Sequence, residues 1–407
     1  MLRLDASLVL ALTLSVASCG GTDVTPREGE SESEGEACAE SEIAVGAVCV
    51  RPPVEEAQRT ACGEITENCD PEGVTTPNFA CHEGDAPAPP AGPAQVTLTG
   101  FVDVFGHGPD ADGVKVQIFD SERLDAQIAE ALAAGALDAD WITTTSFGAD
   151  TLYGEQIVYT AWDDHDEPPP GCRACPGEDD ARDGIACALP RDDCDPPCDL
   201  DANEYCGTKD GEARCIQGRL RWECRYAVPD VPTNRYLTIR TAGEDEQDDQ
   251  AWSPMLQYNN YLFADSLLIS DGSYELKVNV LSYADYVSIP NTVIGVPIAD
   301  ERGAVAGEVR DCDDIRLSFA QVGTFPEPQR YTFFNGNPVT TLPAISGLAV
   351  GTNQDGIYAA LDIPAGKVEV AALVLSAGVP LTVGHVTASV LPGAVTVVGF
   401  AERKPEP

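Results

Sequence analysis

Basic residues are scarce in this sequence. Its 407 residues include 24 Lys and Arg against 67 Asp and Glu, which gives a formal net charge of −43 at pH 7. A negative field of this size repels nucleic acid and anionic lipid headgroups, and it favours solubility and cation binding. The composition therefore argues against nucleic acid as a partner.

Histidine is nearly as scarce, and the usual catalytic motifs are missing. The four histidines are His82, His107, His165 and His385. The sequence has no H-x-x-x-H pair, no G-x-S-x-G elbow and no glycine loop of the kind that holds phosphate. His165, in WDDHDE, is a metal or acid–base candidate, but a solvated acidic loop is the favoured interpretation. We therefore predict no catalytic residues and a protein that is not an enzyme.

Long unbroken hydrophobic runs are also absent. The longest segment without Asp, Glu, Lys or Arg is residues 370–400, and it is interrupted by Gly378-Val379-Pro380, by Gly384 and by Leu391-Pro392-Gly393. Its apolar residues alternate with Thr and Ser, which is typical of buried strands separated by turns. We therefore expect strands in this segment rather than a membrane span.

A shorter apolar run lies near the start. Residues 6–18 carry no charge and follow Met1 and Arg3, as in a secretory signal, and they are too short to span a bilayer, which takes about 20 apolar residues. The run ends in Val16-Ala17-Ser18-Cys19, which resembles the bacterial lipobox. This resemblance implies lipidation of Cys19 and anchoring in the cell envelope, and Gly20 favours the outer membrane by analogy. The alternative is an ordinary signal peptide, with Cys19 in a disulfide.

The remaining cysteines suit an oxidising compartment. Fourteen are left when Cys19 is set aside, an even number, as a disulfide framework requires. They form a set of five, a set of eight and a single residue: Cys38, Cys49, Cys62, Cys69 and Cys81; Cys172, Cys175, Cys187, Cys194, Cys198, Cys206, Cys215 and Cys224; and Cys312. If the eight pair among themselves, Cys312 must bond to the N-terminal set.

The set of eight contains two motif-like stretches. Cys172-Arg-Ala-Cys175 has the spacing of thiol oxidoreductases, but its proline- and acid-rich flanks are loop-like, so a structural disulfide is favoured over a redox or zinc site. The oxygens of Asp199, Asp201, Asn203 and Asp210 stand at the spacing of a calcium loop. Glu204, where such a loop needs glycine, favours an acidic disulfide loop instead. The pattern is loosely similar to knots of the epidermal-growth-factor type, and no other cofactor is expected.

The middle of the chain predicts strands and one helix. Residues 96–119 alternate apolar and polar on both sides of a turn, which indicates two strands joined as a hairpin or by a loop. A helix capped by Asp120 or Ser121 follows, with apolar residues at four-residue spacing, and it is expected to end near 133–135. Further strands are predicted at 236–241, 256–268 and 274–283. The aromatic stretch 252–263 is either buried strand or a sugar-binding face, and burial is favoured.

The last hundred residues carry the clearest pattern. Val305 to Val309, Ala320 to Val322, the Asp355-Gly356 turn before Tyr358, and Ile363 to Val368 follow one another as strands and turns. This order resembles the carboxypeptidase regulatory-like, transthyretin-type β-sandwich, although the family's D-x-x-G is shortened here and its final Tyr is Val368. A second, looser match runs through Gly100, Val114 and Asp271 to Tyr274. The resemblance implies an accessory or binding domain without catalysis.

These patterns together predict an all-β protein. It would hold one or two transthyretin-like or Ig-like β-sandwiches, cysteine-rich disulfide modules and one short helix. The expected parts are a signal peptide (1–18), an acidic tether (19–37), a cysteine-containing module with a Pro-rich linker (38–95), a β-sandwich (96–298) interrupted by an insertion (120–250), and a C-terminal sandwich (299–402).

The expected function is that of an envelope-anchored, non-catalytic binding or structural module of a Gram-negative-type bacterium. Its lipid would anchor it in the membrane. It would bind a protein or carbohydrate ligand at the cell surface. The alternatives are a secreted hydrolase or enzyme accessory unit, acting on carbohydrate or peptide with its site in 120–250, and a calcium-dependent adhesin.

Overall fold

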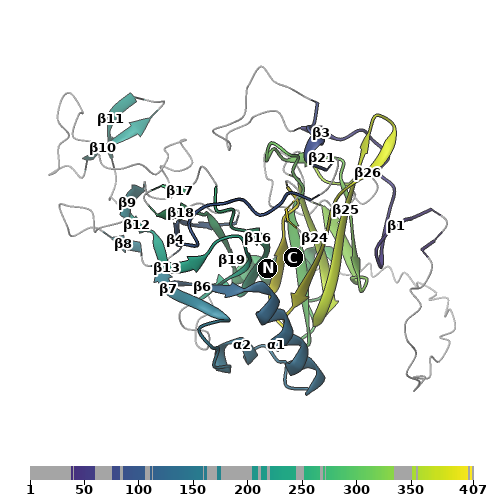
Figure 1. Ribbon diagram of the computed structural model, residues 1–407, viewed down its shortest axis with the longest axis horizontal. Coiled ribbons are helices and arrows are strands. Elements are labelled where there is room, and N and C mark those ends of the chain that lie inside the picture. Colours follow the sequence, from purple (N-terminus) through teal and green to yellow (C-terminus); the bar gives the residue numbers. More distant parts are fainter. Residues whose placement is uncertain are drawn as a thin grey trace, which may run out of the picture. The chain divides into compact units, whose positions relative to one another are not determined.

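A computed structural model describes the chain from residue 38 to residue 405 (Figure 1). Outside the description, in addition to 1–37 and 406–407, lie residues 40, 60–75, 83–85, 106–110, 112, 159, 163–171, 176–203, 210–211, 218–220, 244–251, 266–268, 271, 334–350, 354–355 and 402–403. Residues 38–407 form one compact unit. Within the described residues the chain is mainly β-strand, as predicted, with three α-helices.

An eight-stranded sheet is the centre of this unit. Its order is β23-β24-β20-β27-β16-β14-β6-β7. The strands are β6 (Val114–Asp120), β7 (Leu152–Val158), β14 (Tyr236–Gly243), β16 (Met255–Tyr261), β20 (Arg302–Glu308), β23 (Arg330–Phe333), β24 (Ile357–Pro364) and β27 (Val395–Val398). The two halves meet where β16 runs parallel to β27, with Met255 opposite Val395. One continuous sheet therefore serves both halves of the chain.

Two groups of elements pack on each face of this sheet. Successive residues of a strand point to opposite faces, so neighbouring residues belong to different cores. Phe119, on one face, belongs to a core that includes Leu124 and Ile128 of helix α1 (Ser121–Ala133). The same core is closed by the sheet β22 (Gln321–Phe325), β25 (Gly366–Ser376) and β26 (Val379–Val390). Ile118, on the other face, packs against Leu98 of β4.

The second face is covered by a sheet and a helix. The sheet has the order β13-β4-β18-β17, with β4 (Gln95–Gly100), β13 (Tyr226–Pro232), β17 (Ile269–Ser270) and β18 (Ser273–Glu275). Beside it, α4 (Tyr283–Val293) packs Val293 against Leu361 and Val395. The N-terminal part of the chain therefore covers one face of the shared sheet with strands β13-β4-β18-β17. The C-terminal part covers the other face with β22-β25-β26.

The remaining described elements are short. They are the strands β1 (Ile43–Val45), β2 (Val48–Val50), β3 (Gln58–Arg59), β5 (Val102–Val104), β8 (Thr160–Trp162), β9 (Cys172–Cys175), β10 (Glu204–Lys209), β11 (Glu212–Gln217), β12 (Arg221–Cys224), β15 (Trp252–Ser253), β19 (Val278–Ser282) and β21 (Leu317–Ser318), with helix α2 (Trp141–Thr144) and the 3₁₀ turn η1 (Ala80–His82). None of the described helices is long and apolar enough to cross a membrane.

Most local predictions are confirmed. Asp120 caps α1 by accepting a hydrogen bond from the backbone N–H of Arg123 at 3.1 Å, and the helix ends at Ala133. Residues 370–400 form β25, β26 and β27 rather than a span. The strands predicted at 96–119 do not form a hairpin, because β4 pairs with β13 and β18 while β6 pairs with β7 and β14.

The prediction of one helix is confirmed for α1, but it missed the single turn α2 and the longer α4. Tyr283 was placed in a strand, and the following Val-Ser-Ile-Pro stretch is rich in residues that disfavour helix interiors. The available signal was the Ser282-x-x-Asp285 cap, in which the backbone N–H of Asp285 donates to Ser282 Oγ at 3.0 Å. Burial of Val293 and Pro290 stabilises the helix despite its weak propensity.

Candidate functional site

The N-terminal segment lies against the C-terminal half of the chain. We call its described residues, 38–39, 41–59 and 76–82, the strap. Its first part is the hairpin β1–β2, and a disulfide joins Cys49 of β2 to Cys38, which precedes the hairpin. Val48 and Val50 pack on Ala371 and Leu373 of β25. The hairpin therefore adds a further layer outside the sheet β22-β25-β26.

Glycine at position 323 allows this hairpin to approach closely. A Cβ on Gly323 would lie 2.7 Å from the carbonyl oxygen of Cys49 and 2.9 Å from methyl groups of Val48 and Val50. Real Cβ atoms do not come so near a backbone oxygen, so a side chain here would push the hairpin away. The hairpin of the strap therefore packs here because position 323 is glycine.

The strap continues along the β25–β26 hairpin. The Glu56 carboxylate accepts hydrogen bonds from the backbone N–H groups of Ala377 and Gly378 at 3.0 and 2.7 Å, at a turn where both residues have positive φ. The next residue, Ala57, donates its N–H to the carbonyl of Leu375 at 3.0 Å. β3 then pairs antiparallel with β21. Each contact joins the strap to residues more than 250 positions away in the sequence.

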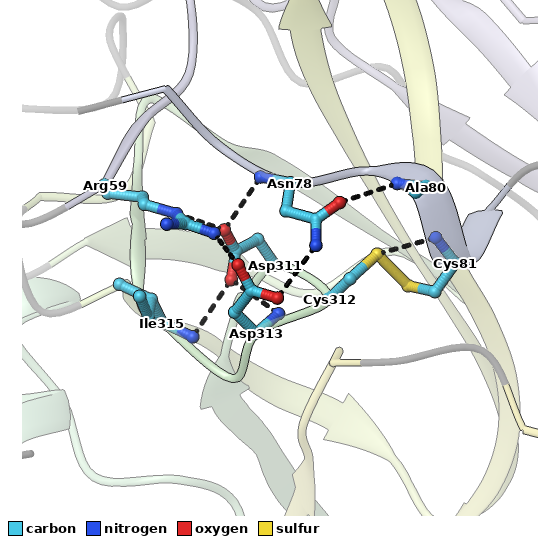
Figure 2. The surroundings of a disulfide bond; sticks show 8 residues. All are labelled: Arg59, Asn78, Ala80, Cys81, Asp311, Cys312, Asp313 and Ile315. Atoms are coloured by element: carbon cyan, nitrogen blue, oxygen red, sulfur yellow. Dashed lines mark hydrogen bonds and ion pairs between the residues drawn. A yellow bond between two sulfur atoms is a disulfide. The ribbon is translucent and has the colours of Figure 1, made fainter. Parts of the chain in front are cut away.

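The strap ends in a charged cluster beside a disulfide, shown in Figure 2. We call Arg59, Asn78, Asp311, Asp313 and the Cys81–Cys312 disulfide the clasp. Arg59 Nε lies 2.5 Å from Oδ2 of Asp311, and its Nη2 pairs with Asp313. The Asp311 side chain is fully buried. The pair therefore links the strap to the loop after β20 through a carboxylate with no access to water.

Asp311 also accepts backbone hydrogen bonds from both sides of the clasp. The N–H of Asn78 lies 2.9 Å from Oδ2, and the N–H groups of Asp313 and Ile315 lie 3.0 and 3.1 Å from Oδ1. Asn78 in turn donates its side-chain amide to Asp313 Oδ1 at 2.8 Å. The hydrogen bonds from Asn78 and Arg59 hold the pKa of Asp313 below its usual range. These carboxylates are therefore engaged in ion pairs and hydrogen bonds.

The disulfide lies at the end of this network. Cys81 and Cys312 are bonded with their Cα atoms 5.7 Å apart and 231 residues apart in sequence. The N–H of Cys312 donates to the carbonyl of Asn78, and the N–H of Cys81 lies 3.0 Å from Cys312 Sγ. The inference that Cys312 bonds to the N-terminal set of cysteines is confirmed.

A second ionic cluster adjoins the clasp. The Glu308 carboxylate, at the end of β20, forms two ion pairs. Its Oε2 lies 2.5 Å from Arg310 Nη2 and its Oε1 lies 2.6 Å from Arg316 Nη2. Burial alone would raise the pKa of Glu308, but the two guanidinium groups outweigh it and lower that pKa. This cluster supports the loop that carries Asp311 and Cys312.

A third polar cluster lies between α1 and the sheets. Oδ1 of Asp125 accepts hydrogen bonds from Tyr258 of β16 at 2.8 Å and from Ser389 of β26 at 2.6 Å. Burial between α1 and the two sheets raises the pKa of Asp125, although both hydrogen bonds favour its charged form. The cluster fastens α1 to two different sheets.

Replacing Asp125 with Asn tests this cluster. Because both hydrogen bonds end on one oxygen, Asn can accept them without ionising, so we expect Asp125→Asn to equal or exceed the wild type in melting temperature at pH 7. The raised folded-state pKa gives the wild type a benefit that is complete below the unfolded-state pKa of about 3.9 and is lost as pH rises through the folded-state pKa.

Melting curves of both proteins between pH 3.5 and 7.5 measure the difference. Relative to Asp125→Asn, the wild type should weaken as pH rises across this range. Asp125→Leu, which removes the oxygen that accepts both hydrogen bonds, should be less stable at every pH. A difference between wild type and Asn variant that grows in favour of the wild type with rising pH would contradict the assignment.

The structure accounts for some of the predicted site residues and not others. Cys172 and Cys175 lie in β9 rather than at a helix N-terminus. Cys206 of β10 is opposite Cys215 of β11, and Cys224 of β12 is opposite Cys172. Cys215 and Cys224 are disulfide-bonded. The residues Cys19, Cys62, Cys69, Cys187, Cys194, Cys198, Asp199, Asp201, Asn203 and Asp210 lie outside the described residues, as do His107 and His165.

The remaining candidates, two histidines and the aromatic stretch, lie mostly in strands or in the 3₁₀ turn. His385, in β26 as predicted, pairs with Glu369 at 3.1 Å, and His82 lies in η1. Tyr258 and Tyr261 of the aromatic stretch are buried in β16, as the favoured interpretation expected. Sequence reasoning found Cys312 but missed Arg59, Asn78 and Asp311. The only available signal was the run of acids around Cys312, which does not specify a partner.

Comparison with known proteins gives no family for this chain. No protein-family model and no curated protein matches it. Among solved structures, a streptococcal ancillary pilin is 10% identical with a TM-score of 0.16, and covers 76% of this chain and 69% of its own. The shaft pilin SpaA of Lactobacillus rhamnosus GG is 7% identical with a TM-score of 0.16, covering 77% and 100%. At these values the likeness carries no weight for fold or function.

Proposed function

We propose that this chain is an envelope-anchored, non-catalytic structural or binding module, tethered through a lipid on Cys19. The observation that supports this proposal is the strap. It begins directly after the predicted tether, and it is fastened to the C-terminal sheets by β-pairing, a buried ion pair and a disulfide. Tension on the tether would enter the body at the strap and pass into the C-terminal half.

The described carboxylates near the clasp also favour a structural role over catalysis. Each of the three carboxylates, on Asp311, Asp313 and Glu308, forms an ion pair with an arginine, and Asp311 also accepts backbone hydrogen bonds. A catalytic acid or base instead needs a proton that it can exchange with a substrate. We propose the outer membrane as the location and a protein or carbohydrate at the cell surface as the ligand.

Substitution of Cys19 tests the anchor. In a Gram-negative host we expect the wild type to partition into the detergent phase and to carry diacylglycerol on its N-terminal peptide by mass spectrometry. Cys19→Ala should move to the aqueous phase, because a protein without its acyl chains loses the buried CH₂ groups that hold it, about 0.8 kcal/mol each.

Cys38→Ser is the matched control, since it also removes one cysteine but lies beyond the tether, and it should stay in the detergent phase. Retention of Cys19→Ala in the detergent phase would overturn the anchor, and so would recovery of Cys19 in a disulfide-linked peptide.

A further inference from the structure

The Cys81–Cys312 disulfide has a third potential metal ligand beside it. The two Sγ atoms and a ring nitrogen of His82 all lie within 4.8 Å of one another. His82 is the last residue of η1, and its N–H donates to the carbonyl of Phe79 at 3.0 Å, which fixes the turn that carries it. All three residues are half-buried. In this structure the two sulfur atoms are bonded to each other, and once reduced to thiolates they and the imidazole would be the donor types of many zinc sites.

The ion pairs and hydrogen bonds of the clasp also hold the two cysteines near each other, independently of the covalent bond. Cys312 donates its N–H to Asn78, and Asn78 is bound through its own N–H and its side chain to Asp311 and Asp313. Arg59 adds the buried ion pair. None of these contacts involves the S–S bond, so we expect both thiols to stay near their present Cα separation of 5.7 Å after reduction.

We propose that the dithiol form of this chain binds one zinc ion through Cys81, Cys312 and His82. Thiolate and imidazole donors select zinc over calcium and magnesium, which prefer oxygen. The N–H of Cys81, 3.0 Å from Cys312 Sγ, stabilises the thiolate that zinc requires. Water fills the fourth position, as in zinc sites with three protein ligands.

The disulfide and the zinc site exclude each other. A dithiol reductant breaks the S–S bond, gives two electrons and two protons to Cys81 and Cys312, and leaves as its own disulfide. Zinc then displaces the two thiol protons and forms two Zn–S bonds. The clasp would thus keep the strap docked in both states, with a covalent bond in one and a metal in the other.

Zinc titration of the reduced full chain tests the proposal. After reduction with a water-soluble phosphine without oxygen, we expect the wild type to bind one more zinc ion than the double variant Cys81→Ser/Cys312→Ser. The matched control is Cys38→Ser/Cys49→Ser, which also removes one pair of thiols and should bind as much zinc at this site as the wild type. His82→Ala should weaken this site at least about tenfold, since losses even of outer-shell partners cost 10–100-fold in affinity.

A second variant removes the need for a reductant, and so covers the case in which full reduction unfolds the protein. Cys81→His leaves the other disulfides intact and gives imidazole, thiol and imidazole at the same place, which should bind Co²⁺ with the visible spectrum of a tetrahedral thiolate complex. Adding His82→Ala should abolish that spectrum. Equal zinc binding by the wild type and Cys81→Ser/Cys312→Ser would overturn the proposal, as would a Co²⁺ spectrum that does not depend on His82.

Discussion

Replacing Cys81 and Cys312 together with serine should lower the free energy of unfolding by about 4–5 kcal/mol. The bond closes a loop with a sequence separation of 231 residues. In the chain-entropy model the stabilisation grows with the logarithm of loop length and reaches about 4.7 kcal/mol for 100 residues. Cys215 and Cys224, which lie within this loop, are themselves disulfide-bonded, and we therefore keep the expected value near the 100-residue figure.

Urea unfolding of the oxidised proteins, followed by far-UV circular dichroism, measures this loss. Cys38→Ser/Cys49→Ser is the matched control, because it removes the same chemical bond from a loop of sequence separation 11 and should cost only about 2–3 kcal/mol. A smaller loss for the 81–312 pair than for the 38–49 pair would contradict this prediction, and would show that the ion pairs and hydrogen bonds of the clasp already close most of the long loop.

Replacing Asp311 with alanine should be nearly as damaging, by about 3–5 kcal/mol. The substitution leaves Arg59 charged and largely buried, and it removes the acceptor of three backbone N–H groups. Removing one partner of a buried ion pair costs about this much in other proteins. In the variant only the half-exposed Asp313 would remain to pair with Arg59. Unsatisfied backbone donors add to the loss.

Asp150→Ala is the matched control for this prediction. Its carboxylate pairs with Arg123, but both side chains are more than half exposed, at 61% and 52%. Exposed pairs are typically worth no more than about 1 kcal/mol. Urea midpoints should therefore fall steeply for Asp311→Ala and hardly at all for Asp150→Ala, and similar midpoints for the two variants would show that the clasp does not stabilise the fold.

The elements that sequence predicted well are those specified by neighbouring residues. Asp120 and the four-residue spacing of Leu124 and Ile128 predicted α1, because a cap and an apolar stripe act within a few turns. Alternation predicted β24, β25 and β26 in the same way. Helix α4 was missed because its stability comes from packing on β24 and β27, which the local sequence does not reveal.

The clasp could be predicted only in part. If every thiol is paired and the set of eight closes among itself, Cys312 must bond to one of the five N-terminal cysteines, and unpaired thiols are rare in oxidising compartments. That argument could not choose Cys81 among five candidates. Nor could it find Arg59 or Asn78, because their partners lie more than 230 residues away.

The sequence by itself determined the all-β class, the position of α1 and the segmentation of residues 370–400 into strands. It also led to a covalent link from Cys312 to the N-terminal cysteines, on the condition that every thiol is paired and the set of eight closes among itself. These follow from periodicity, caps and parity, which are properties of the chain read in order. Only the tertiary structure decided that β16 joins β27 in one sheet, that the strap lies on the C-terminal strands, and that Arg59 meets Asp311 beside the disulfide. The physical reason is that burial makes these contacts favourable, and which residues become buried together depends on the packing of the whole chain.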